Sequence, residues 1–300
     1  MKDTLESLGH KLEMAKELSS VVRTMKALSA SSINQYEKAV LSLEDYYQTI
    51  KLGLFVCVGQ TNEWMRPESN KPGKTAAIVF GAGQGLVGQF NDVLCHYVAG
   101  DLEKMPGEKI VWVVGGSVQA RLEDLGLPPT KQFEVPSTVE GVTPLVGQLL
   151  LDIEKAFESG EVSEIILYYN RPQEGSVYGP IRLRFLPLDE VWIKGLGIKS
   201  WPTKKKPEAV NGTSLTLKAL IREYLFVTLF RASAKSLTSE NASRLAAMQR
   251  AEKNIKDLLN DLNLTYHQLR QSSIDEEMFD VIFGSEAMVE RSTESAEEPT

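Results

Sequence analysis

The last quarter of the chain constrains its fold most strongly. From Ser214 to Phe283 the sequence contains neither proline nor glycine, and this stretch is far longer than an ordinary globular helix. At about 1.5 Å per residue, a helix of this length extends on the order of 100 Å. Its apolar and small residues recur at spacings of three and four, at Leu245, Met248, Ala251, Ile255, Leu258, Leu262, Tyr266 and Leu269. Such spacing is typical of a narrow seam along another helix, so the stretch predicts a long helix with a helical partner.

A second long helical pattern occupies residues 4–56, at the other end of the chain. Thr4 is a suitable N-cap, and the interior Gly9 costs only about 1 kcal/mol relative to alanine, which packing can offset. The apolar positions of this pattern are Leu5, Leu8, Leu12, Ala15, Leu18, Val22, Met25, Ile33, Tyr36, Val40, Leu43, Tyr47 and Ile50.

The two patterns together predict a bent antiparallel coiled coil of the terminal segments. Its arms are residues 1–57 and 213–283. We expect its seam to include Leu18, Val22 and Met25, packed against apolar residues of the C-terminal helix.

The middle of the chain has a different texture, because short apolar strands alternate there with helical patterns. Strands are predicted at 75–80, 110–114, 164–170 and 180–188, helices at 89–99, 117–125 and 144–157, and a loop at 128–144. This alternation indicates an α/β fold: an open sheet domain over residues 75–200, with one antiparallel strand at an edge, inserted between the two coiled-coil arms.

The composition is that of an ordinary soluble protein, with 42% hydrophobic and 24% charged residues. No apolar run approaches the roughly 18 residues that a membrane span requires, and the first residues lack the apolar core of a signal peptide. The net charge of −7 and the lack of a basic face argue against nucleic-acid binding. Residues 284–300 are acidic and rich in small residues, so we expect them to form a disordered tail.

The sequence contains no pattern that indicates chemistry. The two cysteines, Cys57 and Cys95, have neither metal-binding nor redox spacing and indicate free thiols in a reducing cytoplasm. The three histidines are too scattered for a metal site, and no serine or cysteine nucleophile has a convincing histidine partner. We therefore expect no metal, no cofactor and no catalytic residue.

A glycine motif is the one feature that competes with this expectation. Gly83, Gly85 and Gly88 spell G-x-G-x-x-G between a predicted strand and a predicted helix, which is the context of a dinucleotide-binding turn. The acidic residue that should close the second strand is missing, because that strand ends in Gly115-Gly116. Two interpretations follow: a cytoplasmic enzyme that binds a dinucleotide at 83–88, or glycines that only permit a tight turn and close packing.

Both ends of the chain and the glycine turn resemble the gamma subunit of F-type ATP synthases. Residues 237–287 carry a pattern close to that family's C-terminal signature, S-E-x-A-x-R-x-x-A-M, then N, L-x-L-x-Y and R-Q-x-x-I-x-x-E. LSSVVRTMKALSASSI at 18–33 resembles the N-terminal segment, and GQGLVGQFN at 83–91 is similar to the family's D-R-G-L-C-G-x-x-N turn. The match covers nearly the whole chain, more loosely between 100 and 212.

Several positions depart from the family pattern. Gly83 and Gln84 replace the usual Asp-Arg, Val87 replaces the usual cysteine, and the linker WPTKKKPEAVNGT lacks the usual Tyr-x-Glu-Pro character. These differences suggest a divergent branch, such as the alternate bacterial enzymes associated with sodium transport.

The resemblance implies a mechanical function. In that family the helical pair stands inside a ring of alpha and beta subunits, and the globular part sits on the membrane c-ring with the epsilon subunit. Ion-driven rotation of the shaft forces the catalytic sites on the beta subunits through their states, and ATP hydrolysis drives the reverse rotation. The resemblance thus implies a non-catalytic subunit, peripheral to the cytoplasmic face of a bacterial inner membrane and in contact with the membrane only through the rotor.

The resemblance also implies interaction residues, which are Arg23, Met25, Glu240, Arg244, Arg270 and Gln271. Arg270 and Gln271 match residues that touch the catch loop of the beta subunit. Met25 and Arg244 match coupling positions on the helical pair, and Glu240 matches an acidic partner in the same signature. Arg23 stands where a lysine is usual.

The end of the C-terminal helical pattern is apolar without an apolar partner in the sequence. Its residues are Met278, Phe279, Val281, Ile282 and Phe283. By resemblance they suit an apolar bearing at the far end of the cavity in the ring. Asp275 replaces a threonine that is usual in the family.

Overall fold

The structure is a computed structural model, which describes residues 4–59, 73–188, 192, 201, 205, 207–210 and 212–294. The chain divides into two compact units. The sheet unit comprises residues 26–247, and the helical unit comprises residues 1–25 and 248–300. The end of the predicted sheet domain, 193–200, lies outside the described residues, as do 295–300 of the predicted tail.

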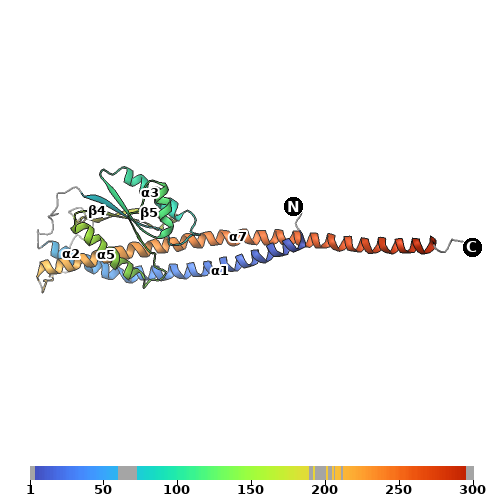
Figure 1. Ribbon diagram of the computed structural model, residues 1–300. Helices are drawn as coiled ribbons and strands as arrows, with labels where there is room; N and C mark the ends of the chain where they lie inside the picture. The colour runs from blue at the N-terminus through green and yellow to red at the C-terminus, as the bar shows by residue number, and fades with distance from the viewer. Residues whose placement is uncertain are drawn as a thin grey trace, which may run out of the picture. The chain divides into compact units, whose positions relative to one another are not determined.

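The sheet unit is built on a mixed sheet (Figure 1). Its strands are β1 (Lys74–Phe80), β2 (Lys109–Val114), β3 (Lys131–Phe133), β4 (Val162–Gln173) and β5 (Ser176–Leu186), in the order β3-β2-β1-β4-β5. The first four strands in that order pair in parallel, whereas β5 pairs antiparallel with β4. The predicted α/β sheet with an antiparallel edge strand is confirmed.

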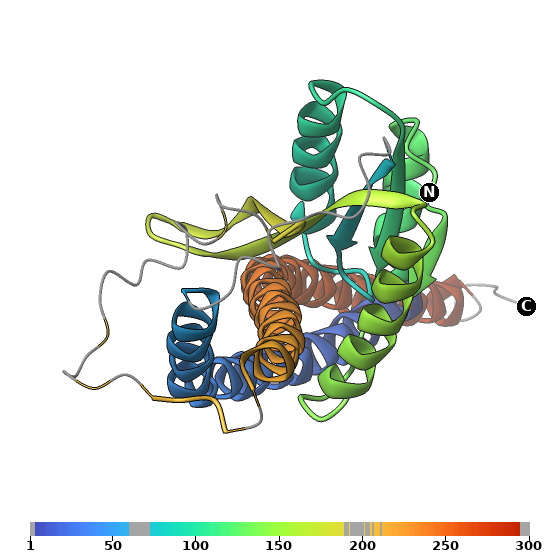
Figure 2. The same ribbon diagram turned by 90° about the vertical axis from the view of Figure 1, so that its left-hand side faces the viewer.

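Helices cover both faces of this sheet. The helices in the described part of the chain are α1 (Leu5–Ser42), α2 (Glu44–Val58), α3 (Phe90–Glu103), α4 (Gly116–Asp124), α5 (Val142–Glu158) and α7 (Thr213–Glu294). One apolar cluster joins the sheet to α3 and α4, and the other joins its opposite face to α5, α7 and the Tyr36 region of α1 (Figure 2). This cover explains why β1 is buried along nearly its whole length, as expected for a central parallel strand.

A third apolar cluster in the sheet unit packs α2 against the beginning of α7. Ile50, Leu54 and Cys57 contribute to it from α2, and Leu217 and Val227 contribute from α7. The sheet domain is therefore inserted between two helical segments, α2 and the beginning of α7, that pack against each other. The predicted architecture, long terminal helices around an α/β domain, is confirmed.

The helical unit contains the beginning of α1 and the end of α7, which run antiparallel (Figure 1). On α1 the buried positions follow heptad spacing, at Leu8, Leu12, Ala15 and Val22. On α7, Met248 is buried and the partly buried positions that follow are Ala251, Glu252, Ile255, Leu259, Leu262, Tyr266, Leu269 and Ser273. This is the predicted coiled-coil spacing.

Two predicted seam residues are wrong by one position. Leu18 is 53% exposed, because the seam passes from Ala15 to Val22 through the neighbouring Ser19, which is partly buried. Leu258 is 49% exposed, because the partly buried neighbour is Leu259. Heptad spacing selects these neighbours in both helices.

The predicted N-terminal helix is divided in two at Leu43. Leu43 has φ −90° and ψ −6°, and α2 begins at the next residue. Glu44 and Asp45 occupy the first turn of α2, where negative side chains interact favourably with the helix dipole.

The predicted loop 128–144 contains the short strand β3, which the sequence did not reveal. Its three residues lie between prolines at 129 and 136, too few for a recognisable alternation. β3 extends the sheet beyond β2 through the pairs of Trp112 with Lys131 and Val114 with Phe133.

The predicted disordered tail is also corrected, because α7 continues to Glu294. Residues 285–294 contain glutamate, alanine, methionine and arginine, all good helix formers, and they contain no proline. An acidic composition therefore did not end the helix. Among the described residues, no helix has the length and apolarity that a membrane span requires.

Candidate functional site

The candidate site is the contact between the glycine turn and α7 inside the sheet unit. The turn connects β1 to α3, and three side chains of α7 bind its backbone. Ser236 Oγ donates to the carbonyl of Phe80 (3.0 Å), and Ser243 Oγ donates to the carbonyl of Val87 (2.5 Å). Between them, the Glu240 carboxylate accepts from the backbone amide of Gly83.

These three residues, Ser236, Glu240 and Ser243, are hereafter called the turn contact. They are spaced four and three residues apart, so they lie on one face of α7. Each is at most 5% exposed. The turn contact therefore fixes the turn to the helix through buried hydrogen bonds, which are costly to leave unmade.

Glu240 is also paired with a cation. Arg244, one turn further along α7, places Nη2 2.7 Å from Glu240 Oε1, and both side chains are nearly buried. Arg244 Nη1 also donates to Asn241 Oδ1 at 3.3 Å. Burial raises the pKa of Glu240 above its ordinary value, although Arg244 and the Gly83 amide act in the opposite direction.

Tyr36 connects α1 to the same region. Its side chain is 3% exposed, and its hydroxyl donates to the carbonyl of Pro136 at 3.5 Å. Burial raises the pKa of this hydroxyl, and the nearby carboxylates of Glu240 and Glu140 raise it further. The turn contact thus lies close to elements from both ends of the chain and from the sheet domain.

The glycines of the turn have different roles. A Cβ on Gly83 would lie 2.9 Å from Val135 Cβ, and Gly88 has a positive φ of 59°. These two positions therefore require glycine for close packing and backbone conformation. Gly85 does not, because a Cβ there would meet nothing within 4 Å and its φ is not in the left-handed region. The expectation that all three glycines are needed for the shape of the turn is wrong for Gly85.

The turn is unsuited to a dinucleotide. A pyrophosphate needs backbone amides that face open space, whereas the Gly83 amide already binds the Glu240 carboxylate. A phosphate placed there would also meet that negative group. Within the described residues, no group of three or more histidine, cysteine or acidic side chains is arranged to hold a metal ion.

The structure brings only some of the predicted interaction residues together. Glu240 and Arg244 form the buried pair of the sheet unit. Arg270 and Gln271 are exposed neighbours on α7 in the helical unit. On α1 of the same unit, Arg23 is exposed and Met25 is partly buried. Their contacts with partner subunits stay predictions.

Two further features complete the candidate residues. Sequence reasoning missed Ser236 and Ser243, whose only signal was the placement of small polar residues at helical spacing around Glu240. The predicted apolar end of α7 is exposed as expected: Met278 is 50%, Phe279 52% and Phe283 63% exposed.

Comparisons with known proteins identify relatives of this chain. A protein-family model described as ATP synthase matches residues 4–288. The chain is 26% identical over 282 residues to the "ATP synthase gamma chain" of Clostridium botulinum strain Hall, covering 91% of this chain and 95% of the relative. It is 27% identical over 295 residues to the gamma chain of Lachnoclostridium phytofermentans, covering 96% of each.

Solved structures show the same fold. A chain in the cryo-EM structure of the Euglena gracilis mitochondrial ATP synthase (OSCP/F1/c-ring, rotational state 3) matches with a TM-score of 0.62 at 15% identity, covering 99% of this chain and 97% of that one. A chain in the rotor of the same enzyme, rotational state 1, matches with a TM-score of 0.58 at 14% identity, covering 90% and 98%.

Proposed function

This chain belongs to the ATP synthase family, and on that basis we propose that it is the gamma subunit, the central shaft of a rotary ATP synthase. The observation that carries the proposal is the architecture: two antiparallel terminal helices with an α/β domain inserted between them, the fold of chains in ATP synthase rotor structures. The gamma chains that it resembles match over nearly their full length.

The parts of the chain suit the transmission of torque. α7 runs without proline from Thr213 to Glu294, so it lacks the most common cause of a kink. Inside the sheet unit, the turn contact joins this helix to the end of β1 and to the turn before α3 through buried hydrogen bonds. A force on the sheet domain would therefore reach α7 through the hydrogen bonds between its side chains and the backbone of β1 and the turn, as well as through apolar packing.

The proposed partners follow from the same architecture. We place the coiled coil in a ring of alpha and beta subunits, and the sheet domain against the epsilon subunit and the c-ring. The chemistry would take place on the partner subunits, as the resemblance to gamma subunits implies. The protein would be peripheral, on the cytoplasmic face of a bacterial inner membrane.

The proposed coupling residues lie in both units. Arg270 and Gln271 are the candidates for contact with the beta subunit, which their exposure on α7 permits. Arg23 and Met25 are candidates on α1. Within the sheet unit, the pair of Glu240 and Arg244 would hold α7 in position rather than meet a partner, because both side chains are nearly buried.

Reconstitution tests the proposal. The chain should co-purify with alpha and beta subunits and restore ATP turnover to a complex that lacks its own gamma subunit. Failure to associate with those subunits would refute the assignment.

The coupling residues can be tested in the same complex. Replacing Arg270 and Gln271 together with alanine should leave assembly intact and lower turnover by one to two orders of magnitude. Charge-assisted contacts are worth about 1.5–3 kcal/mol, and each 1.36 kcal/mol in the transition state is about tenfold in rate. The matched control is Glu276→Ala, an exposed residue on the same helix. Normal turnover in the double variant would contradict the assignment of these two residues.

A further inference from the structure

The turn between β1 and α3 is fixed by side chains of three helices. Besides the hydrogen bonds of the turn contact from α7, the Ala82 amide donates to Asn91 Oδ1 of α3 at 2.9 Å. Ser117 Oγ of α4 donates to the carbonyl of Gly83 at 3.2 Å. The backbone is therefore bound on both sides of residues 84–86, which are themselves exposed.

Leu86 is the apolar side chain that this fixed backbone presents. The side chain is 62% exposed, and its φ of 62° lies in the left-handed region, which leucine rarely adopts. In the described part of the chain, no other residue except glycine has a positive φ. A glycine would adopt this backbone without strain, and the exposed side chain adds nothing to the core. Strained residues that the surrounding structure holds in place are characteristic of binding sites, so the leucine indicates a contact outside this chain.

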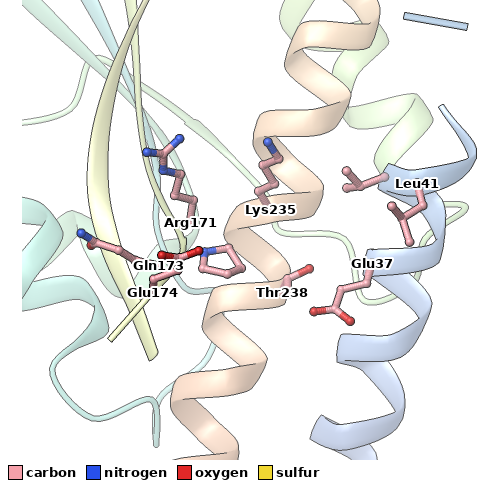
Figure 3. Close-up of a pocket in the computed structure, with 9 residues that line it drawn as sticks. Glu37, Leu41, Arg171, Gln173, Glu174, Lys235 and Thr238 are labelled. Carbon is pink, nitrogen blue, oxygen red and sulfur yellow. The ribbon is translucent and has the colours of Figure 1, made fainter. Parts of the chain in front are cut away.

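The turn carries no charge that could make this contact. Residues 81–91 contain no acidic or basic side chain, and Gln84 stands where gamma subunits usually have an arginine. The groove of about 720 Å³ between α1, α7 and the β4–β5 hairpin is different (Figure 3). It is lined by carboxylates and cations together, which are Glu37, Glu174, Arg171 and Lys235. A partner at the groove would have to match both signs of charge, whereas a partner at the turn meets an apolar side chain among neutral ones.

The position of the turn along α7 indicates which partner it meets. Leu217 of α7 packs against α2, and Ser243 of α7 binds the turn. The helix rises about 39 Å between these two residues, at about 1.5 Å per residue. Met248, the first buried seam residue, follows Ser243 on the same helix. The turn is therefore bound to the last part of α7 before the coiled coil, and the proposed ring of alpha and beta subunits surrounds that coiled coil.

We propose that Leu86 inserts into an apolar pocket at the edge of the ring of alpha and beta subunits. This inference rests on the function proposed above. Enclosing an exposed leucine removes apolar surface from water, which favours association. Because the turn is fixed before the partner arrives, little conformational entropy is lost on binding.

Photo-cross-linking in the reconstituted complex tests which subunit Leu86 meets. The chain has two cysteines, both buried, so Leu86→Cys introduces the one exposed thiol to which benzophenone maleimide can be attached. Illumination should join the label to an alpha or beta subunit. The matched control is Leu125→Cys, since α4 begins after the end of β2 and Leu125, an exposed leucine, follows its last turn at the opposite edge of the sheet. The control label should not join to alpha or beta.

Competition for a limiting amount of the ring measures the contribution of the side chain. Leu86→Gly and Leu86→Asn remove the apolar side chain, and both new residues tolerate the left-handed region, so each full chain should melt at or above the wild-type temperature. Mixed in equal amounts with the wild type, each variant should enter the complex about tenfold less often, as expected for losing one enclosed leucine. The control Leu125→Asn should compete equally with the wild type.

The possible outcomes separate this inference from the proposed function. Cross-linking of the Leu86→Cys label to epsilon or c subunits alone, or to no partner, overturns the inference, and so does equal incorporation of Leu86→Asn and the wild type. In those cases the wild-type chain has assembled, and the shaft function stands. A melting temperature of Leu86→Gly well below that of the wild type also overturns the inference, because the leucine would then serve the fold. If the wild-type chain does not assemble with alpha and beta subunits, the proposed function and this inference are both wrong.

Discussion

Removing the carboxylate of Glu240 should destabilise the sheet unit more than any exposed substitution on α7. Glu240 is 5% exposed, and its carboxylate binds both the Gly83 amide and the Arg244 guanidinium. Glu240→Ala therefore leaves two donors without their acceptor in a place that water reaches poorly. It also creates a cavity beside the turn, because no neighbouring side chain replaces the missing methylene groups.

The size of the effect follows from these contacts. A buried donor left unsatisfied costs about 1–3 kcal/mol, and breaking a buried ion pair by removing one partner costs about 3–5 kcal/mol in total. Because Arg244 keeps its hydrogen bond to Asn241, we expect a loss near the lower end, about 3 kcal/mol. Glu240→Gln keeps an oxygen acceptor for the Gly83 amide, so it should cost roughly half as much.

Urea denaturation of the full chain, followed by far-UV circular dichroism, measures these losses of unfolding free energy. Glu276→Ala is the matched control, since it removes an exposed glutamate from the same helix and should change stability by no more than about 0.5 kcal/mol. If Glu240→Ala stays within about 1 kcal/mol of the wild type, the turn contact does not hold the sheet domain to α7.

The same residue predicts a dependence on pH. The folded-state pKa of Glu240 is raised above the ordinary 4.5, so the folded protein binds this proton more tightly than the unfolded chain does. Its contribution to stability is therefore present below the unfolded pKa and is lost as the pH rises through the folded pKa. Glu240→Gln has no proton to lose, so its unfolding free energy should decline less over that interval. Parallel pH profiles for the two proteins would contradict the shift.

Three further predictions concern the seam, the turn and the end of α7. Leu259→Asp should destabilise the helical unit by several kcal/mol, measured by hydrogen exchange of α7, whereas Leu258→Asp should cost under about 1 kcal/mol; equal effects would misplace the seam. Gly83→Val should lower the melting temperature, because the new side chain clashes with Val135, whereas Gly85→Val should leave the melting temperature nearly unchanged. The reverse order would refute the roles assigned to these two glycines. Deleting residues 289–300 should change neither assembly nor turnover in the reconstituted complex, and loss of either would give the end of α7 a function.

The architecture was predictable because its signals extend over many residues. A stretch without proline or glycine from Ser214 to Phe283, with a heptad pattern, leaves few alternatives to a long paired helix. Strand and helix patterns likewise alternate often enough between 75 and 188 to indicate the sheet. β3 was not predictable, because a strand of three residues has too short a pattern and forms through its pairing with β2.

Both errors within the seam are shifts of one residue. An apolar pattern favours Leu18 over Ser19, whereas Leu258 and Leu259 are both leucine and apolarity does not distinguish them. In the structure, a residue lies in the seam because of its angular position around the helix. A small serine fits that position as well as a leucine does, because it lets two helices approach closely. An error of one residue rotates a side chain by about 100° and exposes it.

The candidate site depended on contacts that sequence separation conceals. Family resemblance identified Glu240 as an interaction residue, but its partner Gly83 lies far away in the chain and meets it only when α7 packs against the turn after β1. The hydroxyls of Ser236 and Ser243 were equally invisible, since serine at helical spacing also fits an ordinary close packing. The sequence pattern predicts the helix face on which a residue lies. The residue that it contacts on another element depends on the topology of the fold.

The glycine motif illustrates how one local sequence serves different purposes. A turn between a strand and a helix gathers backbone amides, and such amides attract an anion. In a dinucleotide-binding protein the anion is a phosphate of the ligand. Here the Glu240 carboxylate takes the place of the phosphate at the Gly83 amide. Glu240 belongs to α7, the helix to which the turn is bound. The anion-binding capacity of this amide is thus used inside the molecule, and the motif becomes a joint between a sheet domain and a shaft helix.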